Sequence, residues 1–399
     1  YAPEVPDSTL TGDQTLWDAG AELTAMNPDS RTIYYPNMIV SQVVDEALLD
    51  AANNPILGDG VTTTFSGTLA HHPVAATTVR IYDDQETFTD RFTDDLQGNF
   101  NGSGTIKRFT GEWTVTFQTA PMLNVPIKAS YSYYSSSSTL VAFNGANVNN
   151  AMLALNNDFV WPTGYIHDFN GDNNFDEVDA DWLVQWIRGY RQPGVNPDVA
   201  PRIKKEWLLG PIDHSTAAVL VPPGFPLWYF GSQVTDAERE QYEIFRTAHD
   251  DRDTVVFVGS RDGMLHAFDG GKYRYGDNPE TPGIEEHRGY FLWEPKTGSD
   301  PSYCDAYIAN CPNYGTGEEL WAFIPANLLP RLKNNLLKAD DQAFVDASPA
   351  LADAYVDTNA DGLADTWKTV LLSAEGNGGD TVFCLDITCL LYTSPSPRD

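Results

Sequence analysis

Short apolar segments separated by turn residues constrain the fold of this chain most strongly. From residue 254 onward, TVVFVGS, MLHAFDG and ELWAFIP each have the length and the β-branched or aromatic content of a strand. We expect them to be successive strands of one sheet, with a long loop over residues 271–316 between the second and the third. TWKTVLLSAEG and GDTVFCLDIT then repeat the first pair as apolar strand, glycine-bearing turn and strand ending in Asp.

This repetition predicts a mainly β chain with a partial β-propeller of quinoprotein-like blades over residues 201–388. Two copies of the unit are too few to close a ring. Either other blades are irregular or the chain is cut short. The last segment, residues 389–399, reads CLLYTSPSPRD and fits no blade, so we expect a tail that is foreign to the fold.

A second β region precedes this one. Residues 57–135 contain even, short segments rich in Val, Ile, Thr and aromatic residues, separated by Gly, Asp, Asn and Pro. WTVTFQT alternates apolar and polar residues as a half-buried strand does. The pattern predicts a small β-sandwich inserted as a self-contained module.

The remaining segments favour helices and loops. Residues 1–56 form an N-terminal segment that leads into the propeller region, and LWDAGAELTAM and VVDEALLDAA within it have helix-like apolar spacing. Residues 136–200 are expected to be a helical segment, with NGANVNNAMLALNNDFV before an acidic loop and ADWLVQWIRGY after it. A further helix is expected around DAEREQYEIFRTAH.

The acidic loop is DFNGDNNFDEVD, residues 168–179. Calcium takes six to eight oxygen ligands, and a twelve-residue loop supplies them from places 1, 3, 5, 7, 9 and 12. In this loop those places are held by Asp168, Asn170, Asp172, Asn174, Asp176 and Asp179. Asn173 replaces the usual glycine at place 6 and tolerates a left-handed backbone. We expect an EF-hand or dockerin-like calcium loop; the alternative is a solvated acidic loop.

A second loop, DTNADGLAD, spans residues 357–365. It would close a β-hairpin and bind calcium structurally, and the alternative is a turn rich in Asp and Asn. Its expected ligands are the side chains of four residues and one backbone carbonyl: Asp357, Asn359, Asp361, Asp365 and the carbonyl of Leu363.

Charge and cysteine content limit the possible partners. The formal charge is −32 at pH 7, which opposes binding to nucleic acid or to anionic membranes. No stretch of about 20 apolar residues is present, so we expect no membrane span.

Cys304 and Cys311 lie in one polar loop and are candidates for a disulfide of an exported protein, with two free thiols as the alternative.

Signatures of catalysis are weak. The motifs GxSxG, HExxH and GxxxxGK[ST] are absent. Asp213, His214 and Ser215 are consecutive and therefore cannot form a triad within a strand, so we expect chance or a structural role. Two alternatives to a non-enzymatic protein stay open: a quinoprotein-like propeller dehydrogenase, and a dockerin-like extracellular binding scaffold.

Five motifs, in order, resemble the C-terminal propeller region of the PilC/PilY family of type IV pilus proteins. They are LWDAGAELTAMNPDSRTIYY, VQWIRGYR, KEWLLGPIDHSTAAVLVPP, VVFVGSRDGMLHAFDGG and GEELWAFIPANLLPRL, supported by the later DTWKTVLL and LDIT. The inserted module at 57–135 and Cys384 within VFCLDIT depart from the family pattern.

The resemblance implies a surface-exposed, non-enzymatic protein at the pilus tip, exported through the periplasm and acting in pilus biogenesis and adhesion. It implies pilin or minor pilins as partners, with a host or surface ligand of unspecified chemistry. It also implies a calcium loop within the propeller, similar to the loop at residues 357–365. Ca²⁺ is thus the only cofactor that we expect.

Overall fold

The computed structural model describes residues 16–389, with internal gaps. Outside the description lie residues 51, 73, 75–77, 84–91, 95–98, 102, 108–109, 150–151, 154, 156–167, 175, 195–201, 284–288, 296–309, 340–341, 360–361 and 380. Within the described part, strands outweigh helices, several small sheets are present and no sheet closes into a barrel. The mainly β prediction is therefore confirmed.

The chain forms twenty strands in the described part. They are β1 (Ile33–Ala47), β2 (Thr64–Thr68), β3 (Arg80–Asp83), β4 (Phe92–Thr93), β5 (Gly104–Lys107), β6 (Glu112–Thr116), β7 (Ile127–Ala142), β8 (Tyr190–Gln192), β9 (Ile203–Lys204), β10 (Ala218–Leu220), β11 (Val255–Gly259), β12 (Leu265–Asp269), β13 (Tyr273–Arg274), β14 (Tyr290–Phe291), β15 (Trp293–Pro295), β16 (Asn310–Pro312), β17 (Glu319–Phe323), β18 (Ala350–Val356), β19 (Thr366–Ala374) and β20 (Val382–Asp386).

Helical elements are fewer and short. The α-helices described are α1 (Ala19–Ala25), α2 (Glu177–Arg188), α3 (Asp236–Ala248) and α4 (Leu332–Leu337). Short 3-10 helices are η1 (Pro28–Ser30), η2 (Leu227–Phe230), η3 (Ala326–Arg331) and η4 (Gly376–Gly378). The helices expected at LWDAGAELTAM, ADWLVQWIRGY and DAEREQYEIFRTAH are confirmed as α1, α2 and α3. In the described part of the chain, no helix combines the length and the apolar character needed to cross a membrane.

The first strand repeat forms an antiparallel meander. β10, β11, β12 and β17 are hydrogen-bonded neighbours in that order, and β13 to β16 lie in the long connection between β12 and β17. The expected order of TVVFVGS, MLHAFDG and ELWAFIP in one sheet is thus confirmed. Beyond β17 the sheet continues with β1, which pairs with β17 in parallel.

The second strand repeat forms a separate antiparallel sheet in the order β18-β19-β20. Its junction with the first meander is tight, because a Cβ atom added at Gly259 would lie 2.3 Å from the carbonyl oxygen of Val345. The Val345 amide donates to the Ser260 carbonyl at 3.0 Å across the same junction. β10 also lies against β18. The end of β11 and the segment that leads into β18 therefore pack backbone against backbone.

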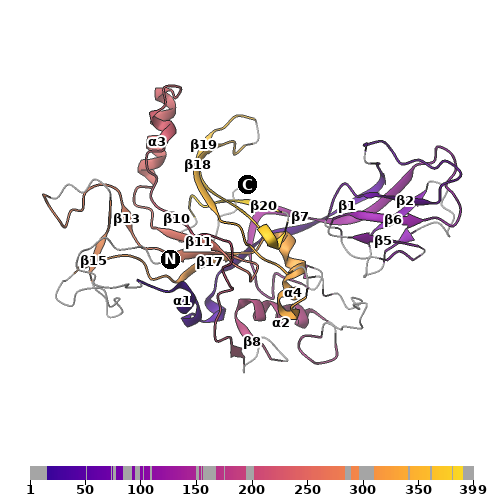
Figure 1. Ribbon diagram of the computed structural model, residues 1–399, viewed down its shortest axis with the longest axis horizontal. Coiled ribbons are helices and arrows are strands. Elements are labelled where there is room, and N and C mark those ends of the chain that lie inside the picture. Colours follow the sequence, from indigo (N-terminus) through magenta and orange to yellow (C-terminus); the bar gives the residue numbers. More distant parts are fainter. Residues whose placement is uncertain are drawn as a thin grey trace.

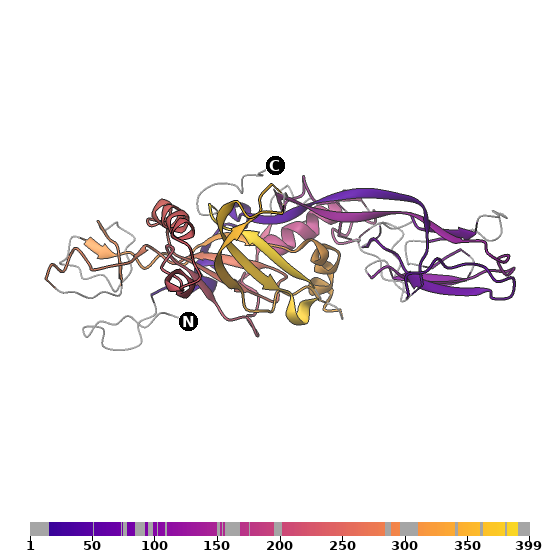
Figure 2. The same ribbon diagram turned by 90° about the horizontal axis from the view of Figure 1, so that it is seen from above.

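A long two-stranded ribbon joins the central body to a distal module (Figures 1 and 2). β1 and β7 are 15 and 16 residues long and pair antiparallel from Tyr34 opposite Ala142 to Ala47 opposite Lys128. The ladder is interrupted by register shifts, and Asp45 has a positive φ of 56° at one of them. Such irregularities increase the local twist of a ribbon.

Two helix predictions are wrong at this ribbon and after it. VVDEALLDAA begins inside β1, because pairing with β7 outweighs the helix-like spacing of a short apolar run. β7 extends through Ala142 into the segment that was expected to be helical. The described residues of NGANVNNAMLALNNDFV form turns rather than a helix.

The distal module has its own core. One layer is the sheet β2-β6-β5, and the other is formed by β3 and β4 with the distal halves of β1 and β7. Trp113, Val115 and Phe117 are buried between exposed or half-buried neighbours, as the alternation of WTVTFQT predicts. The buried residues of this core all lie between Leu48 and Tyr131. The central core contains none of them and includes residues from β11, β12, β17 and α2.

This separation of cores predicts that the module can be removed. Replacing residues 43–131 by Asn-Gly, a favoured two-residue hairpin turn, would join Gln42 to Ser132, which are register partners. We expect the shortened chain to unfold in one cooperative transition within a few degrees of the parent, measured by circular dichroism. A broad transition or a large drop in melting temperature would show that the two cores depend on each other.

Candidate functional site

The acidic loop at residues 168–179 runs directly into α2. Asp176 is the N-cap of α2 and its carboxylate accepts from the Val178 amide at 2.9 Å. The Asp179 carboxylate reaches back to the Asp176 amide at 3.1 Å, which completes a capping box. Gly171 and Asn173 have φ values of 78° and 65°, so the backbone turns through left-handed positions at both residues. The left-handed backbone at Asn173 is the one that the sequence predicts.

The side chains of this loop point at its own backbone amides. Asp168 Oδ1 accepts from the amides of Gly171 at 2.7 Å and Asp172 at 3.1 Å. Asp168 Oδ2 accepts from Asn173 at 2.8 Å, and Asp179 Oδ1 accepts from Phe169 at 2.8 Å. The loop therefore wraps around the carboxylates of its first and last places. The side chains of Asn170, Asp172, Asn174 and Asp176 lie on the segment between them.

Two oxygen-bearing side chains of this loop are buried close to further carboxylates. Asp179 and Asn170 are buried, with 1% and 7% of their surface exposed. Burial raises the pKa of Asp179, and the nearby Asp168 carboxylate adds to the rise. A cation among these oxygens would favour the charged form. The donor set of carboxylate and amide oxygens fits a hard cation such as Ca²⁺.

The loop at residues 357–365 closes the hairpin of β18 and β19, in which Val356 pairs with Thr366. Asp357 Oδ2 accepts from the Gly362 amide at 2.7 Å, and Gly362 has a φ of 87°. Hydrogen bonds from Thr366 and Thr358 lower the pKa of Asp365. Asn359, Leu363 and the other described residues of the loop are exposed, and Asp361 lies outside the described residues. Its oxygens also fit Ca²⁺ chemically, in a more open setting than the first loop.

The cysteines differ in state. Cys311 in β16 is disulfide-bonded, whereas Cys384 and Cys389 are free and exposed. Cys304 lies outside the described residues. Its pairing with Cys311 therefore stays a prediction.

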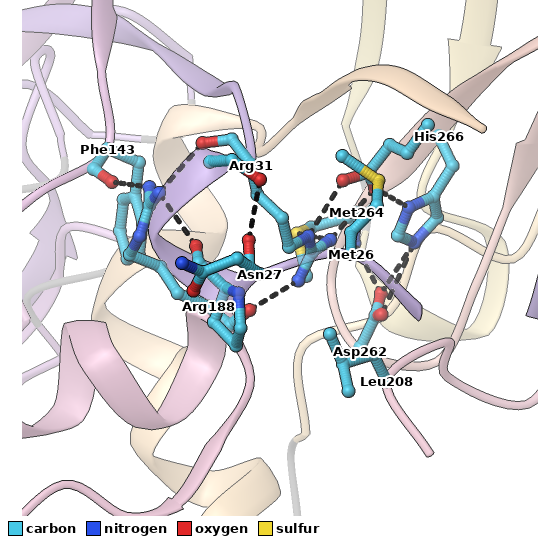
Figure 3. A network of polar contacts seen from close by, with 12 residues as sticks. Met26, Asn27, Arg31, Phe143, Arg188, Leu208, Asp262, Met264 and His266 are labelled. Atoms are coloured by element: carbon cyan, nitrogen blue, oxygen red, sulfur yellow. Dashed lines mark hydrogen bonds and ion pairs between the residues drawn. The ribbon is translucent and has the colours of Figure 1, made fainter. Parts of the chain in front are cut away.

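At the other end of α2, Arg188 donates to four backbone carbonyls of two segments (Figure 3). Its Nη1 donates to Phe143 O at 3.0 Å, just after β7. Its Nη2 donates to Pro28 O at 3.0 Å, Asp29 O at 3.2 Å and Arg31 O at 2.7 Å, in and after η1. Arg188 is buried, with 7% of its surface exposed. One side chain thus fixes α2 against both ends of the ribbon where it enters the central body.

Arg31 continues this network into the sheet. It forms a bidentate ion pair with Glu319 of β17, at 2.7 Å from Nε and 2.8 Å from Nη2. Its Nη1 donates to the Arg188 carbonyl at 2.8 Å. Both charged side chains of the pair are fully buried. Bidentate pairing satisfies the carboxylate geometrically, which a buried ion pair needs to offset its desolvation.

His266 of β12 completes the network (Figure 3). Its Nδ1 lies 2.7 Å from Glu319 Oε1, and its Nε2 lies 3.3 Å from Asp262. Ser260 donates to the same Asp262 carboxylate. Burial opposes the imidazolium most strongly, but Asp262 and Glu319 outweigh it and raise the pKa of His266 to about 9.

Within the network, the cluster of Arg31, His266, Asp262 and Glu319 is electrically balanced near neutral pH. Against the opposing effect of burial, His266 and Arg31 lower the pKa of Asp262 to about 2. Arg31 and His266 likewise lower the pKa of Glu319 to about 2 against the effect of burial. Two cations, Arg31 and His266, therefore face two carboxylates. These contacts join the segment before β1 to β12 and β17, and the Ser260 hydroxyl, 3.0 Å from His266 Nε2, is buried beside them.

Sequence reasoning did not identify this network. Its residues are far apart in the chain, and Arg31, Arg188 and Glu319 look like surface charges when each is considered alone. The one local signal is SRDGMLH, in which Ser260, Asp262 and His266 fall within seven residues of a predicted strand pair.

The Arg188 contacts predict a large loss of stability on truncation. Arg188→Met keeps a similar length but leaves buried carbonyls without their charged donor. We expect the free energy of unfolding to fall by about 3–5 kcal/mol in urea titrations. Arg191→Met is the matched control, since the Arg191 side chain is 56% exposed, and it should change stability by less than ~0.5 kcal/mol. Equal effects of the two substitutions would contradict the role of Arg188.

The raised pKa of His266 predicts a pH-dependent stability. The unfolded-state pKa is about 6.5, so the stabilisation is complete below pH ~6.5 and is lost as pH rises through the folded value. Because the folded pKa is about 9, the parent should lose on the order of 3 kcal/mol between these values relative to His266→Gln. The carboxylates act oppositely: their contribution is present above pH ~4 and is lost as pH falls towards their folded pKa values of about 2.

The measurement is chemical denaturation of parent and His266→Gln from pH 5 to pH 9.5. Lys205, whose pKa burial lowers to about 8, titrates in the same window in both proteins, so the difference between them isolates His266. A stability difference that is flat with pH would contradict a charged His266.

Comparison with known proteins finds curated relatives that are similar to about half of this chain. A type IV pilus biogenesis factor PilY1 of Pseudomonas aeruginosa strain UCBPP-PA14 is 29% identical over 189 residues, 46% of this chain. Two PilY1 homologues of Xylella fastidiosa strain Temecula1 are 26% and 28% identical over 57% and 51% of this chain. In each case the match spans 12% of the relative's own length.

No family model and no solved structure matches the chain. The similarity of this chain to known proteins therefore rests on the curated relatives. Over 46% to 57% of its length, this chain is similar to type IV pilus biogenesis factors named PilY1, which confirms the expected resemblance to the PilC/PilY family.

Proposed function

We propose that this chain is part of a calcium-binding, surface-exposed type IV pilus protein that acts in pilus biogenesis and adhesion without catalysis. The observation that carries the proposal is the similarity to curated pilus biogenesis factors. Its partners are then pilin or minor pilins at the pilus tip, reached by export through the periplasm. An adhesive surface would come from exposed loops and from the distal module.

The two strand meanders support a propeller-like body for this function. β10-β11-β12-β17 has the four antiparallel strands of a propeller blade, and β18-β19-β20 supplies three strands of a second one. We propose that these are two blades of a quinoprotein-like propeller. The balanced contacts of the Arg31, Glu319 and His266 network would then serve to hold the first blade to the ribbon.

Calcium would be held at the loop before α2 by oxygen atoms from places 1, 3, 5, 7, 9 and 12 of the loop. The proposed ligands are Asp168, Asn170, Asp172, the carbonyl of Asn174, Asp176 and Asp179. The ion supplies positive charge that offsets the repulsion among these carboxylates. The chain's own part is to hold the loop closed through the capping box and the amides around Asp168.

A second calcium would lie in the hairpin loop between β18 and β19. Its proposed ligands are Asp357, Asn359, Asp361, the carbonyl of Leu363 and Asp365. Both ions would be structural. The ion at residues 168–179 would have the larger effect on the rest of the protein. α2 begins at the calcium loop and ends at Arg188, so order in the loop is transmitted by a rigid helix to the base of the ribbon.

Calorimetry with calcium tests this proposal. We expect two binding events, with dissociation constants of about 0.1–1 mM typical of extracellular sites. Asp168→Asn removes the charge and one of the two acceptor oxygens that face the loop amides, and it should abolish one event; Asp357→Asn should abolish the other. At a tenfold excess over the dissociation constant, each ion should add ~1.4 kcal/mol to the free energy of unfolding.

Asp250→Ala is the control, since Asp250 is exposed and lies outside both loops. It should bind calcium as the parent does. No heat from the folded parent at millimolar calcium would refute the calcium part of the proposal. The pilus part is tested separately by placing Asp168→Asn in the whole protein of a piliated bacterium, where fewer surface pili are expected and unchanged piliation would count against it.

A further inference from the structure

A histidine and two carboxylates meet at the junction between the two meanders. Asp213 and His214 lie in the segment before β10, and Asp346 lies in the segment before β18. One ligand atom of each lies within 4.8 Å of the others. We propose that these three side chains bind a divalent transition metal of the zinc class, at a site separate from both calcium loops.

Asp346 is the anchored member of this set. Its side chain is only 5% exposed, and its Oδ2 lies 2.7 Å from His214 Nδ1. Its Oδ1 accepts from the His214 amide at 3.2 Å, and Asn377 donates to its Oδ2 at 3.1 Å. The carboxylate is therefore oriented before any metal arrives, which reduces the ordering cost of binding.

The backbone on both sides of the site is held in register. Ser215 Oγ donates to Ala347 O at 3.1 Å and accepts from the Gly259 amide at 2.9 Å. The Thr216 amide donates to Ser348 Oγ at 2.9 Å. The segment after His214 thus runs beside the segment after Asp346. Ser215 serves this structural purpose, as expected for a residue that is not part of a triad.

The outer face of the site is open for further ligands. The side chains of His214 and Asp213 are 62% and 48% exposed, and His214 Nδ1 lies 3.6 Å from Asp213 Oδ2. One imidazole nitrogen and two carboxylate oxygens make a three-ligand set, and water can complete a four-coordinate ion. Imidazole suits zinc, copper, iron and nickel, whereas calcium takes oxygen ligands.

Arg261 competes for one of the ligands. Its Nη1 lies 3.4 Å from Asp213 Oδ2, and its guanidinium also stacks over the Phe344 ring at 4.4 Å. A metal ion and this guanidinium would repel each other, so Arg261 must turn away when the metal binds. Removing the Arg261 charge should therefore raise the zinc affinity of this site. Zinc bound adventitiously to an exposed histidine elsewhere would not respond to that change.

Metal binding here would join the two sheets. Asp213 and His214 lie just before β10, and Asp346 lies just before β18. An ion shared between them would act where Gly259 already lies against Val345. The expected consequence is a more rigid junction between the first and the second meander.

Zinc titration by calorimetry on the full chain tests the proposal, in excess calcium so that the oxygen-lined loops are saturated. We expect one zinc-binding event. His214→Asn keeps a donor near Asp346 but is a poor zinc ligand, and it should weaken zinc affinity by at least ~10-fold, the lower end of what loss of a ligand's supporting partner costs. Arg261→Gln should strengthen it several-fold, and zinc should raise the melting temperature of the parent but not of His214→Asn.

His72→Asn is the matched control, because His72 is an exposed histidine in the distal module. It should bind zinc as the parent does. Equal zinc affinity in the parent and in His214→Asn would overturn the proposal, as would loss of binding in His72→Asn instead. Absence of any zinc heat from the folded parent would overturn it as well.

Discussion

The bidentate pair between Arg31 and Glu319 is the interaction on which the central body depends. Both side chains are fully buried, so either charge left alone would cost several kcal/mol. Arg31 lies just before β1, Glu319 begins β17, and His266 of β12 contacts the same carboxylate. Satisfying all three charges requires that segments far apart in the sequence become neighbours. The parallel pairing of β1 with β17 brings Arg31 and Glu319 close to each other.

The ribbon of β1 and β7 divides the molecule into two cores without a flexible linker. Its proximal residues Ile33 and Tyr35 belong to the central core, and its distal residues Ala129 and Tyr131 belong to the module. The antiparallel pairing of β1 with β7, with its two register shifts, sets the direction of the module from the base. Arg188 acts at that base, which explains why one helix end makes so many contacts to backbone carbonyls.

Local patterns predicted the local structure well. The strands β11, β12 and β17, the alternation around Trp113 and the helix after Asp176 follow from residues that lie close together in sequence. β1 was missed because VVDEALLDAA suits either helix or strand, and its partner β7 is distant in sequence: Glu46 pairs with Ala129, 83 residues further along the chain. The buried network was missed for a related reason. A lone Arg or Glu indicates a surface position, and only the folded topology brings Arg31 and Glu319 together.

Basic side chains are scarce in this protein, and this scarcity connects the buried network with the proposed metal sites. The chain has 24 Lys and Arg residues against 56 Asp and Glu residues, and Arg31 and Arg188 are both committed to buried contacts. Exposed carboxylates therefore have few basic side chains to pair with. A divalent ion neutralises two charges at one point and needs no side-chain ordering of its own. Clusters of carboxylates at turns and at a sheet junction, as at Asp168 and Asp346, are where such an ion gives the greatest relief of repulsion.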